Sequence, residues 1–569
     1  MNKKIIINTL EKIALYLELQ GENPFKVSAF RKAAAALEAD QRSLSEIDDI
    51  TQIKGIGKGT AAVINELMEN GESLVLKELE EKTPKGLIPL MKLPGLGGKK
   101  LAKLYQDLGI DSVDSLRIAC ENKEVQKLAG FGAKTEEKIL KELEHLGERS
   151  EKHPIWQLEM IVRDINDLLS SIYEIKQFSV AGSFRRVNEM SKDIDFVIST
   201  DNREIVKEKI LEDLVVKEVV ADGDTKVSVV LDLDDAINVD FRLVSDDEYA
   251  TALHHFTGSK DHNVKMRQLA KQQDKKISEY GVEQPDGTIK TFNSEKAFYA
   301  HFNLPYIPPT IRESGQELDR LDEIQHLVTI DDIVSDLHMH TTWSDGAHSV
   351  QEMGKALIDR DYTHGVITDH SQYLKVANGL TPERLLRQRQ EIYAFNDEHP
   401  EFRLYAGTEM DILPNGTLDF DDEVLKSLDF VISSIHSSFS QSQDKIMERL
   451  FTAIKNPYVH MIAHPTGRII GEREGYNPDV PQLIKWAAEY GKILELNASP
   501  YRLDLSIDYL TMAMEYNVPI AINTDAHAIE QLRYMKLGTE YAQKAWLKKE
   551  LIVNTWSQKD FETFLYKNK

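Results

Sequence analysis

The C-terminal part of the chain, from about residue 333 onward, is a series of short apolar segments separated by stretches with helical patterning. Most segments run directly into histidine or an acid, as in VSDLHMH, HGVITDH and PIAINTDAH. Apolar strands that alternate with helices are typical of a parallel α/β fold. Strand ends meet at one rim of a parallel barrel, so distant side chains converge there. We therefore expect residues 333–569 to form an α/β barrel of about seven parallel strands.

The residues at these strand ends have the chemistry of metal ligands. Imidazole combined with carboxylate, without thiolate, suits Mn²⁺, Zn²⁺ or Fe²⁺. Any one of these histidines alone is more simply a structural residue, but the full set predicts a centre for up to three ions. Such a centre supports hydrolysis of a phosphoester. The nine expected ligands are His338, His340, Asp345, His370, Glu409, His436, His464, Asp525 and His527. Asn497 also ends a strand, but it is a poor ligand and is expected to orient its neighbours.

The region from about 155 to 300 also alternates strands with helices, and one of its turns is suited to phosphate. Gly182 and Ser183 close the strand FSVAGS and begin a helix, where backbone amides and a hydroxyl can hold a phosphate oxygen. Arg186 adds a guanidinium fork for the same anion. This part of the chain is therefore expected to be an α/β domain that binds a phosphorylated ligand.

Three acids in the same region are placed to bind a pair of ions. Asp193 and Asp195 are two residues apart in one strand and so point to one face, and Asp240 lies in the later strand NVDFR. Two Mg²⁺ or Mn²⁺ ions between three carboxylates would activate a primer 3′-hydroxyl and stabilise leaving pyrophosphate. A lone D-x-D is usually a solvated strand edge. Together with the phosphate-binding turn, the three acids predict nucleotidyl transfer.

Residues 1–150 contain one pattern three times, an apolar-x-Gly-apolar-Gly turn followed by a helix, at 53–64, 93–104 and 128–139. The glycines permit a tight turn, and the amides at the helix start can hold a DNA phosphate without reading sequence. One copy would fit an ordinary glycine-capped connection, whereas three favour α-helical helix–hairpin–helix DNA binding. The third copy carries Glu136 and Glu137 and is expected to bind phosphate least. The glycines expected to contact DNA are Gly55, Gly57, Gly95 and Gly97.

The charge of the chain constrains how it can meet DNA. The net charge of −25 argues against a protein that simply coats DNA. Residues 1–150, however, hold 23 Lys and Arg against 24 Asp and Glu, so the excess acid lies downstream. Cys120 is the one cysteine, which excludes an intrachain disulfide, and its apolar helical surroundings place it in a core. With neither a signal peptide nor a membrane span in the pattern, we expect a cytoplasmic protein that binds no membrane.

These motifs resemble two known families. Residues 1–305 are similar to the family X DNA polymerases of the DNA polymerase beta type, on PFKVSAFRKAA, the first two hairpins, GSFRR, DID, VDFR and HFTGSKDHNVKMR. Residues 333–569 resemble the polymerase-and-histidinol-phosphatase (PHP) domain, with all nine ligand positions filled. The fusion resembles bacterial family X polymerases. It implies a monomer that uses dNTPs to fill short gaps in gapped or primer–template DNA during base-excision or end-joining repair. It also implies a Mn²⁺-dependent 3′–5′ exonuclease, with abasic-site endonuclease and 3′-phosphatase activity, in the PHP domain.

The resemblance assigns roles to individual residues. Asp193, Asp195 and Asp240 match the catalytic, metal-binding acids. Lys26 and Lys32 match basic residues that hold a downstream 5′-phosphate. The expected nucleotide-site residues are Gly182, Ser183, Arg186, His255, Phe256, Gly258, Lys260, Asn263 and Arg267.

The chain also departs from the eukaryotic pattern of that family. His255 stands in place of a tyrosine, Lys260 in place of an aspartate and Asn238 in place of an arginine. Val63 occupies the position of the lysine that performs lyase chemistry. Sugar discrimination is therefore expected to be imperfect, and lyase activity to be low.

The pattern and the resemblance together divide the chain into six regions. We expect an N-terminal helical domain with the first hairpin (1–85), a helical subdomain with the other two hairpins (86–150), a nucleotidyltransferase palm (151–245), a thumb-like subdomain over the nascent base pair (246–315), a linker (316–332) and the PHP domain (333–569).

Two other functions would share part of this sequence. One is a small-molecule phosphatase of the histidinol-phosphate type with a DNA-binding appendage, which the GSFRR–DID–VDFR set argues against. The other is a non-catalytic DNA scaffold, which would not need twelve metal ligands of the right types. Primer extension on gapped DNA, beside hydrolysis of a small phosphate monoester, separates all three.

Overall fold

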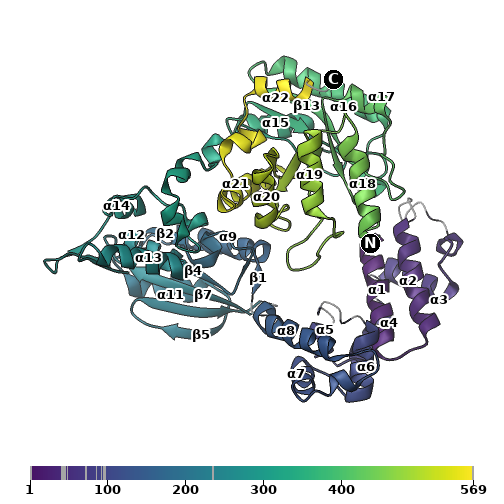
Figure 1. The fold of residues 1–569 in the computed structure, drawn as a ribbon, viewed down its shortest axis with the longest axis horizontal. Coiled ribbons are helices and arrows are strands. Elements are labelled where there is room, and N and C mark those ends of the chain that lie inside the picture. The colour runs from purple at the N-terminus through teal and green to yellow at the C-terminus, as the bar shows by residue number, and fades with distance from the viewer. Residues whose placement is uncertain are drawn as a thin grey trace. The chain divides into compact units, whose positions relative to one another are not determined.

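The chain divides into two compact units, Met1–Glu151 and Lys152–Lys569 (Figure 1). The computed structural model describes residues 3–39, 47, 49–70, 73–84, 86–90, 93, 96, 98–150, 152–233 and 236–566. Within these ranges, no helix combines the length and the apolar composition that a bilayer span needs.

The first unit is α-helical, as expected. Apolar faces of its helices, with Leu10, Leu17, Leu104 and Cys120 among them, pack into one buried cluster. Ser112 caps one helix by accepting from the amide of Ser115. The helices are α1 (Lys3–Leu19), α2 (Pro24–Ala39), α3 (Lys58–Asn70), α4 (Leu74–Lys82), α5 (Leu87–Leu90), α6 (Gly98–Leu108), α7 (Val113–Glu121) and α8 (Ala133–Ser150).

The second unit begins with a palm built on a five-stranded sheet of order β2-β4-β7-β6-β5. Strands β4 and β7 are parallel and the other neighbours antiparallel. Phe196 stacks on Phe241 between adjacent strands, with ring centroids 5.7 Å apart. The strands are β2 (Ile175–Val180), β4 (Asp193–Thr200), β5 (Val216–Asp222), β6 (Lys226–Leu231) and β7 (Ile237–Val244); the helices are α9 (Ile155–Ser171), α10 (Gly182–Arg185) and α11 (Arg203–Asp213). A short pair, β1 (His153–Pro154) and β3 (Met190–Ser191), lies beside them.

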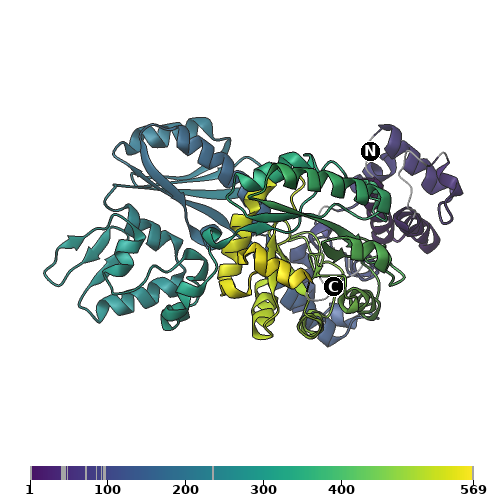
Figure 2. The same ribbon diagram turned by 90° about the horizontal axis from the view of Figure 1, so that it is seen from above.

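The thumb region follows the palm and forms the adjacent teal lobe in Figure 2. It contains α12 (Tyr249–Thr257), α13 (Lys260–Lys271), α14 (Glu295–Ala300) and a small sheet of β8 (Lys276–Ser278), β9 (Gly281–Glu283) and β10 (Ile289–Lys290). The expected linker, 316–332, holds three short 3₁₀ helices, η5 (Gln316–Asp319), η6 (Leu321–His326) and η7 (Ile330–Asp332). Its Glu317 is buried and accepts from His262 Nδ1 at 2.6 Å, so this segment packs on the thumb.

The C-terminal region is a seven-stranded, all-parallel sheet in which every strand pairs with the next in sequence. A parallel bridge between Met339 and Ala526 brings the two edges together, so the sheet is a nearly closed barrel. The expected fold class is therefore confirmed. The strands are β11 (Ser335–Asp336), β12 (His364–Ile367), β13 (Arg403–Asp411), β14 (Phe430–Ser434), β15 (Met461–Ile462), β16 (Ile493–Asn497) and β17 (Ile520–Asn523).

Helices surround this barrel (Figure 1). They present apolar stripes inward; α19, for example, buries Leu483, Ile484 and Ala487. The helices are α15 (Val350–Ile358), α16 (Pro382–Glu398), α17 (Asp422–Ser427), α18 (Gln443–Lys455), α19 (Val480–Tyr490), α20 (Ile507–Glu515), α21 (Tyr534–Lys544) and α22 (Gln558–Tyr566).

The palm and the barrel region share a core within the second unit. Ile155 and Val187 of the palm are buried in the same apolar cluster as residues of the barrel helices. Trp156 stacks on Tyr501 with ring centroids 5.1 Å apart. Its indole N–H donates to the carbonyl of Ile470 at 3.0 Å. The two regions are therefore joined by buried side chains as well as by the chain between them.

Candidate functional sites

The carboxyl ends of the barrel strands carry a dense group of histidines and acids. Glu409 in β13 lies at its centre: one oxygen is 2.9 Å from His464 Nε2 and 3.2 Å from His436 Nε2. The other oxygen is 2.9 Å from His370 Nδ1 and 3.4 Å from His338 Nε2. Four expected ligands from the ends of four other strands thus meet around the carboxylate of a fifth, Glu409.

Three sets of side chains in this group have ligand atoms within 4.8 Å of one another. Glu409 belongs to two of them, in one of which Asp525 is a second acid, and Asp345 is the acid of the third. His464 stands outside these sets but contacts Glu409. The sets are His340, Asp345, His370 and His527; His338, His340, Glu409 and Asp525; and His370, Glu409 and His436. The structure therefore brings all nine expected ligands together.

The hydrogen bonding of the group fits metal ions better than protons. Glu409 Oε2, His340 Nδ1, His370 Nδ1 and His464 Nδ1 are buried atoms without a hydrogen-bond partner among the described residues. Leaving such atoms unpaired in a dry interior is costly. Glu409 Oε2 also lies close to three imidazole nitrogens without hydrogen-bond geometry. An ion between these atoms would satisfy them, and the donor set of imidazole and carboxylate suits Mn²⁺, Zn²⁺ or Fe²⁺.

The electrostatics of the group also favour coordination. Burial opposes charge on Glu409, yet the surrounding histidines, His436 first, hold its pKa well below the usual value. Burial and the neighbouring His527 and His370 lower the pKa of His340 to about 3. Against burial, Asp411 and Glu409 raise the pKa of His436 to about 10, and Asp345 and Asp525 raise the pKa of His527 to about 9. These two imidazoles must lose a proton before they can bind an ion, so metal binding at this group would be accompanied by proton release.

Two ligands have a backbone conformation that side chains rarely adopt. His464 has φ +27° and Asp525 has φ +53°. Left-handed backbone at residues other than glycine is strained and collects at functional sites. Each residue lies two positions after the end of a strand, β15 or β17, at the rim where the ligands meet.

A second layer of buried carboxylates holds these ligands, and none of it was expected from the sequence. Glu495 accepts from His338 Nδ1 at 2.7 Å and from the backbone amide of His464 at 2.6 Å. Asp411 lies 3.2 Å from His436 Nδ1. Such partners fix the orientation of a ligating imidazole. Strand alternation could have found both, because Asp411 is two residues from Glu409 and Glu495 two from Asn497, on the same faces.

Two further residues complete the rim of the group. Asn497 donates to Asp525 Oδ2 at 3.1 Å and to Glu495 Oε2 at 3.3 Å, so it orients its neighbours as expected. Arg502, which the sequence did not single out, places its Nε 3.8 Å from Asp525 Oδ2 and stays partly exposed. A guanidinium at the edge of an acid-rich centre is suited to an anionic substrate.

The palm brings the three expected acids together on adjacent parallel strands. Asp195 of β4 is paired in register with Asp240 of β7, and Asp193 lies two residues before Asp195 on the same face. Burial and the charges of Asp193 and Asp240 raise the pKa of Asp195 to about 7. Burial and Asp240 likewise raise the pKa of Asp193. Lys226 Nζ lies 2.7 Å from Asp240 Oδ2. Crowded carboxylates of this kind fit hard divalent cations.

The expected phosphate-binding turn lies directly against these acids. Gly182 begins α10 with φ +61°, and a Cβ there would stand 2.2 Å from Asp195 Oδ2, so no larger residue fits. Ser183 Oγ donates to Ser191 Oγ at 2.8 Å. Arg186 caps α10, and its guanidinium donates to the carbonyl of Thr257 at 2.6 Å. Arg185, which the sequence did not assign, pairs with Glu295 at 2.7 Å.

The expected residues of the thumb approach the same turn. Gly258 has φ +68°, and a Cβ there would lie 3.3 Å from Arg186 Nη1. Phe256 lies under the Arg242 guanidinium at 4.6 Å and meets the ring of His255 edge-on at 4.9 Å. Asn263, on α13 with Lys260 and Arg267, donates to the carbonyl of His255 at 2.8 Å. Lys260 and Arg267 are exposed.

The first unit contains the expected DNA-contact residues in part. Gly55 has φ +115° in the turn before α3, and a Cβ on Gly57 would meet open space. Gly95 and Gly97 lie outside the described residues. Lys26 and Lys32 are exposed on α2, and Lys26 lies 3.5 Å from Glu22. The two lysines present cations, and the glycine turn leaves space for a close approach of the DNA backbone.

Two other residues of this unit face the interior. Val63, at the position of the lyase lysine, is buried in the helical core. Glu136 of the third hairpin is buried as well and accepts from the amide of Gln126 at 2.8 Å, so this acid caps a neighbouring turn.

Comparison with known families matches separate parts of the chain. Residues 1–73 match a helix-hairpin-helix domain and residues 87–145 a SAM-like helix-hairpin-helix tandem. Residues 252–313 match the DNA polymerase beta thumb, and residues 336–499 match the PHP domain.

Comparison with individual proteins finds a relative along the whole chain. The chain is 55% identical over 569 residues, 100% of both proteins, to the protein of Bacillus subtilis (strain 168) named DNA polymerase/3'-5' exonuclease PolX. It is 28% identical over 234 residues, 39% of this chain and 91% of the relative, to a probable phosphatase of Thermoanaerobacter sp. (strain X514). A probable phosphatase of Caldicellulosiruptor bescii is 31% identical over 170 residues, 28% of this chain and 67% of the relative.

Proposed function

The chain belongs to the bacterial family X DNA polymerases with a C-terminal PHP domain, and from this premise we propose how its two centres share the work. The palm fills short gaps in DNA by nucleotidyl transfer from dNTPs. The PHP centre removes nucleotides from 3′ ends, and it also serves abasic-site cleavage and 3′-phosphate removal. A polymerase that can trim a mismatched or blocked terminus and then extend it is suited to base-excision and end-joining repair.

One observation carries the polymerase assignment. Asp195 and Asp240 are register partners on parallel strands, and the Gly182 turn approaches Asp195 so closely that a Cβ would clash with its carboxylate. The turn that would hold a triphosphate and the acids that would hold its counter-ions thus form one surface. A phosphatase with a DNA-binding appendage would have no use for this surface.

The palm residues have distinct proposed tasks. Asp193, Asp195 and Asp240 would hold two Mg²⁺ or Mn²⁺ ions, which lower the barrier to attack by the primer 3′-hydroxyl. Ser183, the amide of Gly182 and the Arg186 guanidinium would bind the triphosphate. Phe256 and Gly258 would lie against the sugar beside His255, and Asn263 and Arg267 would face the nascent base pair, with Lys260 at the start of the same helix.

The PHP residues also have separate proposed tasks. The nine ligands would hold up to three Mn²⁺, Zn²⁺ or Fe²⁺ ions, which supply the hydrolytic chemistry. Glu495 and Asp411 fix the imidazoles of His338 and His436. Arg502 would contact the phosphate of the 3′-terminal nucleotide. The buried positions of His338, His340 and Glu409 exclude bulk water from the ligand atoms.

The remaining regions are proposed to hold and place DNA. We assign DNA binding to residues 1–85 and 86–150 and nucleotidyl transfer to the palm, residues 151–245. Residues 246–315 would close over the nascent base pair. Residues 316–332 would connect this part of the chain to the PHP domain, residues 333–569. Lys26 and Lys32 would hold a 5′-phosphate, and Gly55, Gly57, Gly95 and Gly97 would approach the DNA backbone. The protein is proposed to act as a monomer in the cytoplasm, on DNA that is undergoing repair.

Primer extension on one-nucleotide-gapped DNA tests this proposal, run beside 3′-end degradation of single strands and hydrolysis of a small phosphate monoester. Gap filling together with 3′–5′ degradation is the expected result. Fast monoester hydrolysis without extension would identify a phosphatase instead. DNA binding without either reaction would identify a scaffold.

A further inference from the structure

The loop that follows the phosphate-binding turn is held by the PHP domain. This loop, 186–189, belongs to the palm, yet Val187 is buried in the barrel core cluster with φ +58°. Arg468 of the PHP domain pairs with Glu189 at 2.9 Å, and the hydroxyl of Tyr541 also hydrogen-bonds this acid. A β-branched residue in left-handed backbone persists only where its surroundings hold it. The PHP domain therefore sets the conformation of the chain just beyond the nucleotide site.

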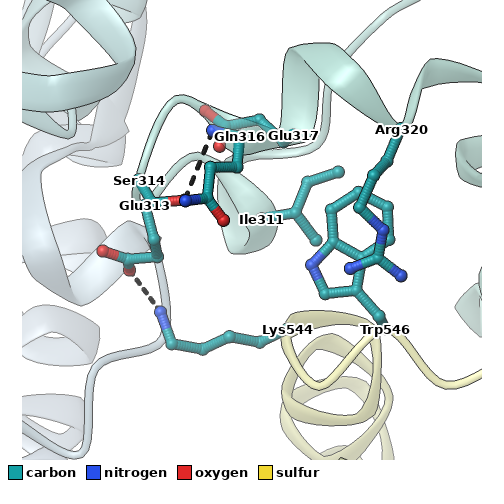
Figure 3. A pocket seen from close by; sticks show the side chains of 8 residues that line it. All are labelled: Ile311, Glu313, Ser314, Gln316, Glu317, Arg320, Lys544 and Trp546. Carbon is teal, nitrogen blue, oxygen red and sulfur yellow. Dashed lines mark hydrogen bonds and ion pairs between the residues drawn. The ribbon is translucent and has the colours of Figure 1, made fainter.

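Lys544, the last residue of α21, also contacts this loop. Its side chain is 9% exposed. Its ammonium donates to the carbonyl of Arg186 at 2.9 Å and to Asn188 Oδ1 at 2.9 Å. A third donor goes to Glu313 of the thumb, as Figure 3 shows. All three N–H donors of the Lys544 ammonium, a group of the PHP domain, are thus bonded to acceptors in the palm and the thumb.

Glu313 is the residue through which Lys544 meets the nucleotide site. The same oxygen, Oε1, accepts from Lys544 and from Arg186 Nε, the latter at 3.3 Å. Arg186 is only 13% exposed, and it is the guanidinium proposed to bind the triphosphate. A carboxylate on this guanidinium competes with the phosphate for the same charge and donors. Lys544 offers that carboxylate a second cation.

Glu313 already contacts Lys544, and its surroundings leave room for it to part from Arg186. A cavity of about 180 Å³ lies beside the pair, lined by Ile311, by Gln316 and by Arg320 and Trp546, which lie together (Figure 3). The Arg320 guanidinium stacks on the Trp546 ring at 3.8 Å and so forms a fixed wall. Glu313 is 39% exposed, so its side chain is not locked by packing.

We propose that Lys544 is a positioning residue of the polymerase centre, which draws Glu313 away from Arg186 and so frees the guanidinium for the incoming triphosphate. The inference rests on the proposed role of Arg186. It makes the PHP domain, apart from its own hydrolytic centre, a determinant of dNTP affinity. Lys544 would not change the chemical step at the palm. It would change only how readily the Arg186 guanidinium can bind the triphosphate.

Lys544→Met in the full chain tests the proposal, because it removes the charge and keeps most of the apolar stem. KM for dNTP should rise about tenfold, the size of one charge-assisted contact. The turnover number, the Kd for gapped DNA and the 3′–5′ exonuclease should stay within about twofold, because only ground-state nucleotide binding is affected. The retained exonuclease also reports that the PHP domain is folded.

Two further variants make the result specific. Adding Glu313→Gln to Lys544→Met should return KM toward the wild-type value, since the competing charge is then gone. Lys536→Met is the matched control, because Lys536 lies on the same helix, is 72% exposed and contacts Glu540 at 4.0 Å. It should leave KM unchanged.

The outcomes separate this inference from the assignment of Arg186. Suppose first that Arg186→Ala raises KM for dNTP. The inference about Lys544 is then wrong if Lys544→Met leaves KM unchanged, or if it raises KM and the added Glu313→Gln does not restore it. If Arg186→Ala leaves KM unchanged, both the proposed triphosphate contact and the role of Lys544 are wrong.

Discussion

The two metal sites of this chain differ in where their ligands come from and how deeply they lie. The palm site takes three acids from two adjacent strands, and Asp193 is exposed. The PHP site takes its ligands from loops and strands between residues 338 and 527, and His338, His340 and Glu409 are buried almost completely. An open, all-carboxylate site is suited to ions that arrive with a nucleotide. A buried, imidazole-rich site with a second layer of carboxylates is suited to ions that stay.

The comparison predicts that the palm can be disabled without harm to the other site. Asp195→Ala should lower gap filling by about a thousandfold or more, because it removes charge stabilisation at the reacting atoms. The exonuclease should persist, since the PHP ligands lie in a separate region. Steady-state extension and degradation of a single-stranded 3′ end measure the two effects. Loss of both activities in a folded variant would show that the sites are coupled.

A smaller effect is expected from the layer of carboxylates behind the PHP ligands. Glu495→Gln should lower exonuclease activity or metal affinity by about 10- to 100-fold, because His338 loses its charged partner. Extension should stay unchanged. Titration of metal-free protein with Mn²⁺, followed by the exonuclease rate, measures the shift. Wild-type Mn²⁺ affinity and activity in this variant would contradict the role of Glu495.

The nucleotide site offers a subtler test, at the sugar. His255 stands where related eukaryotic enzymes carry tyrosine; its backbone carbonyl accepts from Asn263, and its ring meets that of Phe256. We expect incomplete exclusion of ribonucleotides, and His255→Tyr should improve discrimination about tenfold, the size of one altered contact. Single-nucleotide insertion of matched dNTP and rNTP gives the ratio. Discrimination of several orders of magnitude that the substitution leaves unaltered would dismiss the idea.

The smallest effect is expected in the first unit. Lys32 is exposed on α2, so a 5′-phosphate in the gap should strengthen binding about fivefold through one partly screened contact. Lys32→Ala should erase that preference, whereas Lys82→Ala, which removes an exposed lysine of α4, should keep it. Titrations with gapped DNA that carries or lacks the phosphate give the ratio. Equal affinities for the two DNAs in the wild-type protein would refute the contact.

Sequence motifs predicted the barrel, the palm and the residues of both centres. They could do so because a position at a strand end, or two residues apart within one strand, already determines to which side the ligand side chain points. Asp411 and Glu495 were not predicted, although alternation with Glu409 and Asn497 places them on the ligand face. The contact of Lys544 with Glu313 could not be predicted, because the two residues are 231 positions apart and meet only through packing of the PHP domain on the thumb.

The most direct test of two separate centres is Glu409→Ala, assayed for extension and for 3′–5′ degradation in one preparation. Glu409 contacts imidazoles from four other strand ends, so its loss should dismantle the PHP centre. The account predicts that exonuclease activity falls below about one hundredth of wild type while gap filling stays within about twofold. Exonuclease activity that survives, or extension that disappears with it in a folded protein, would contradict the account.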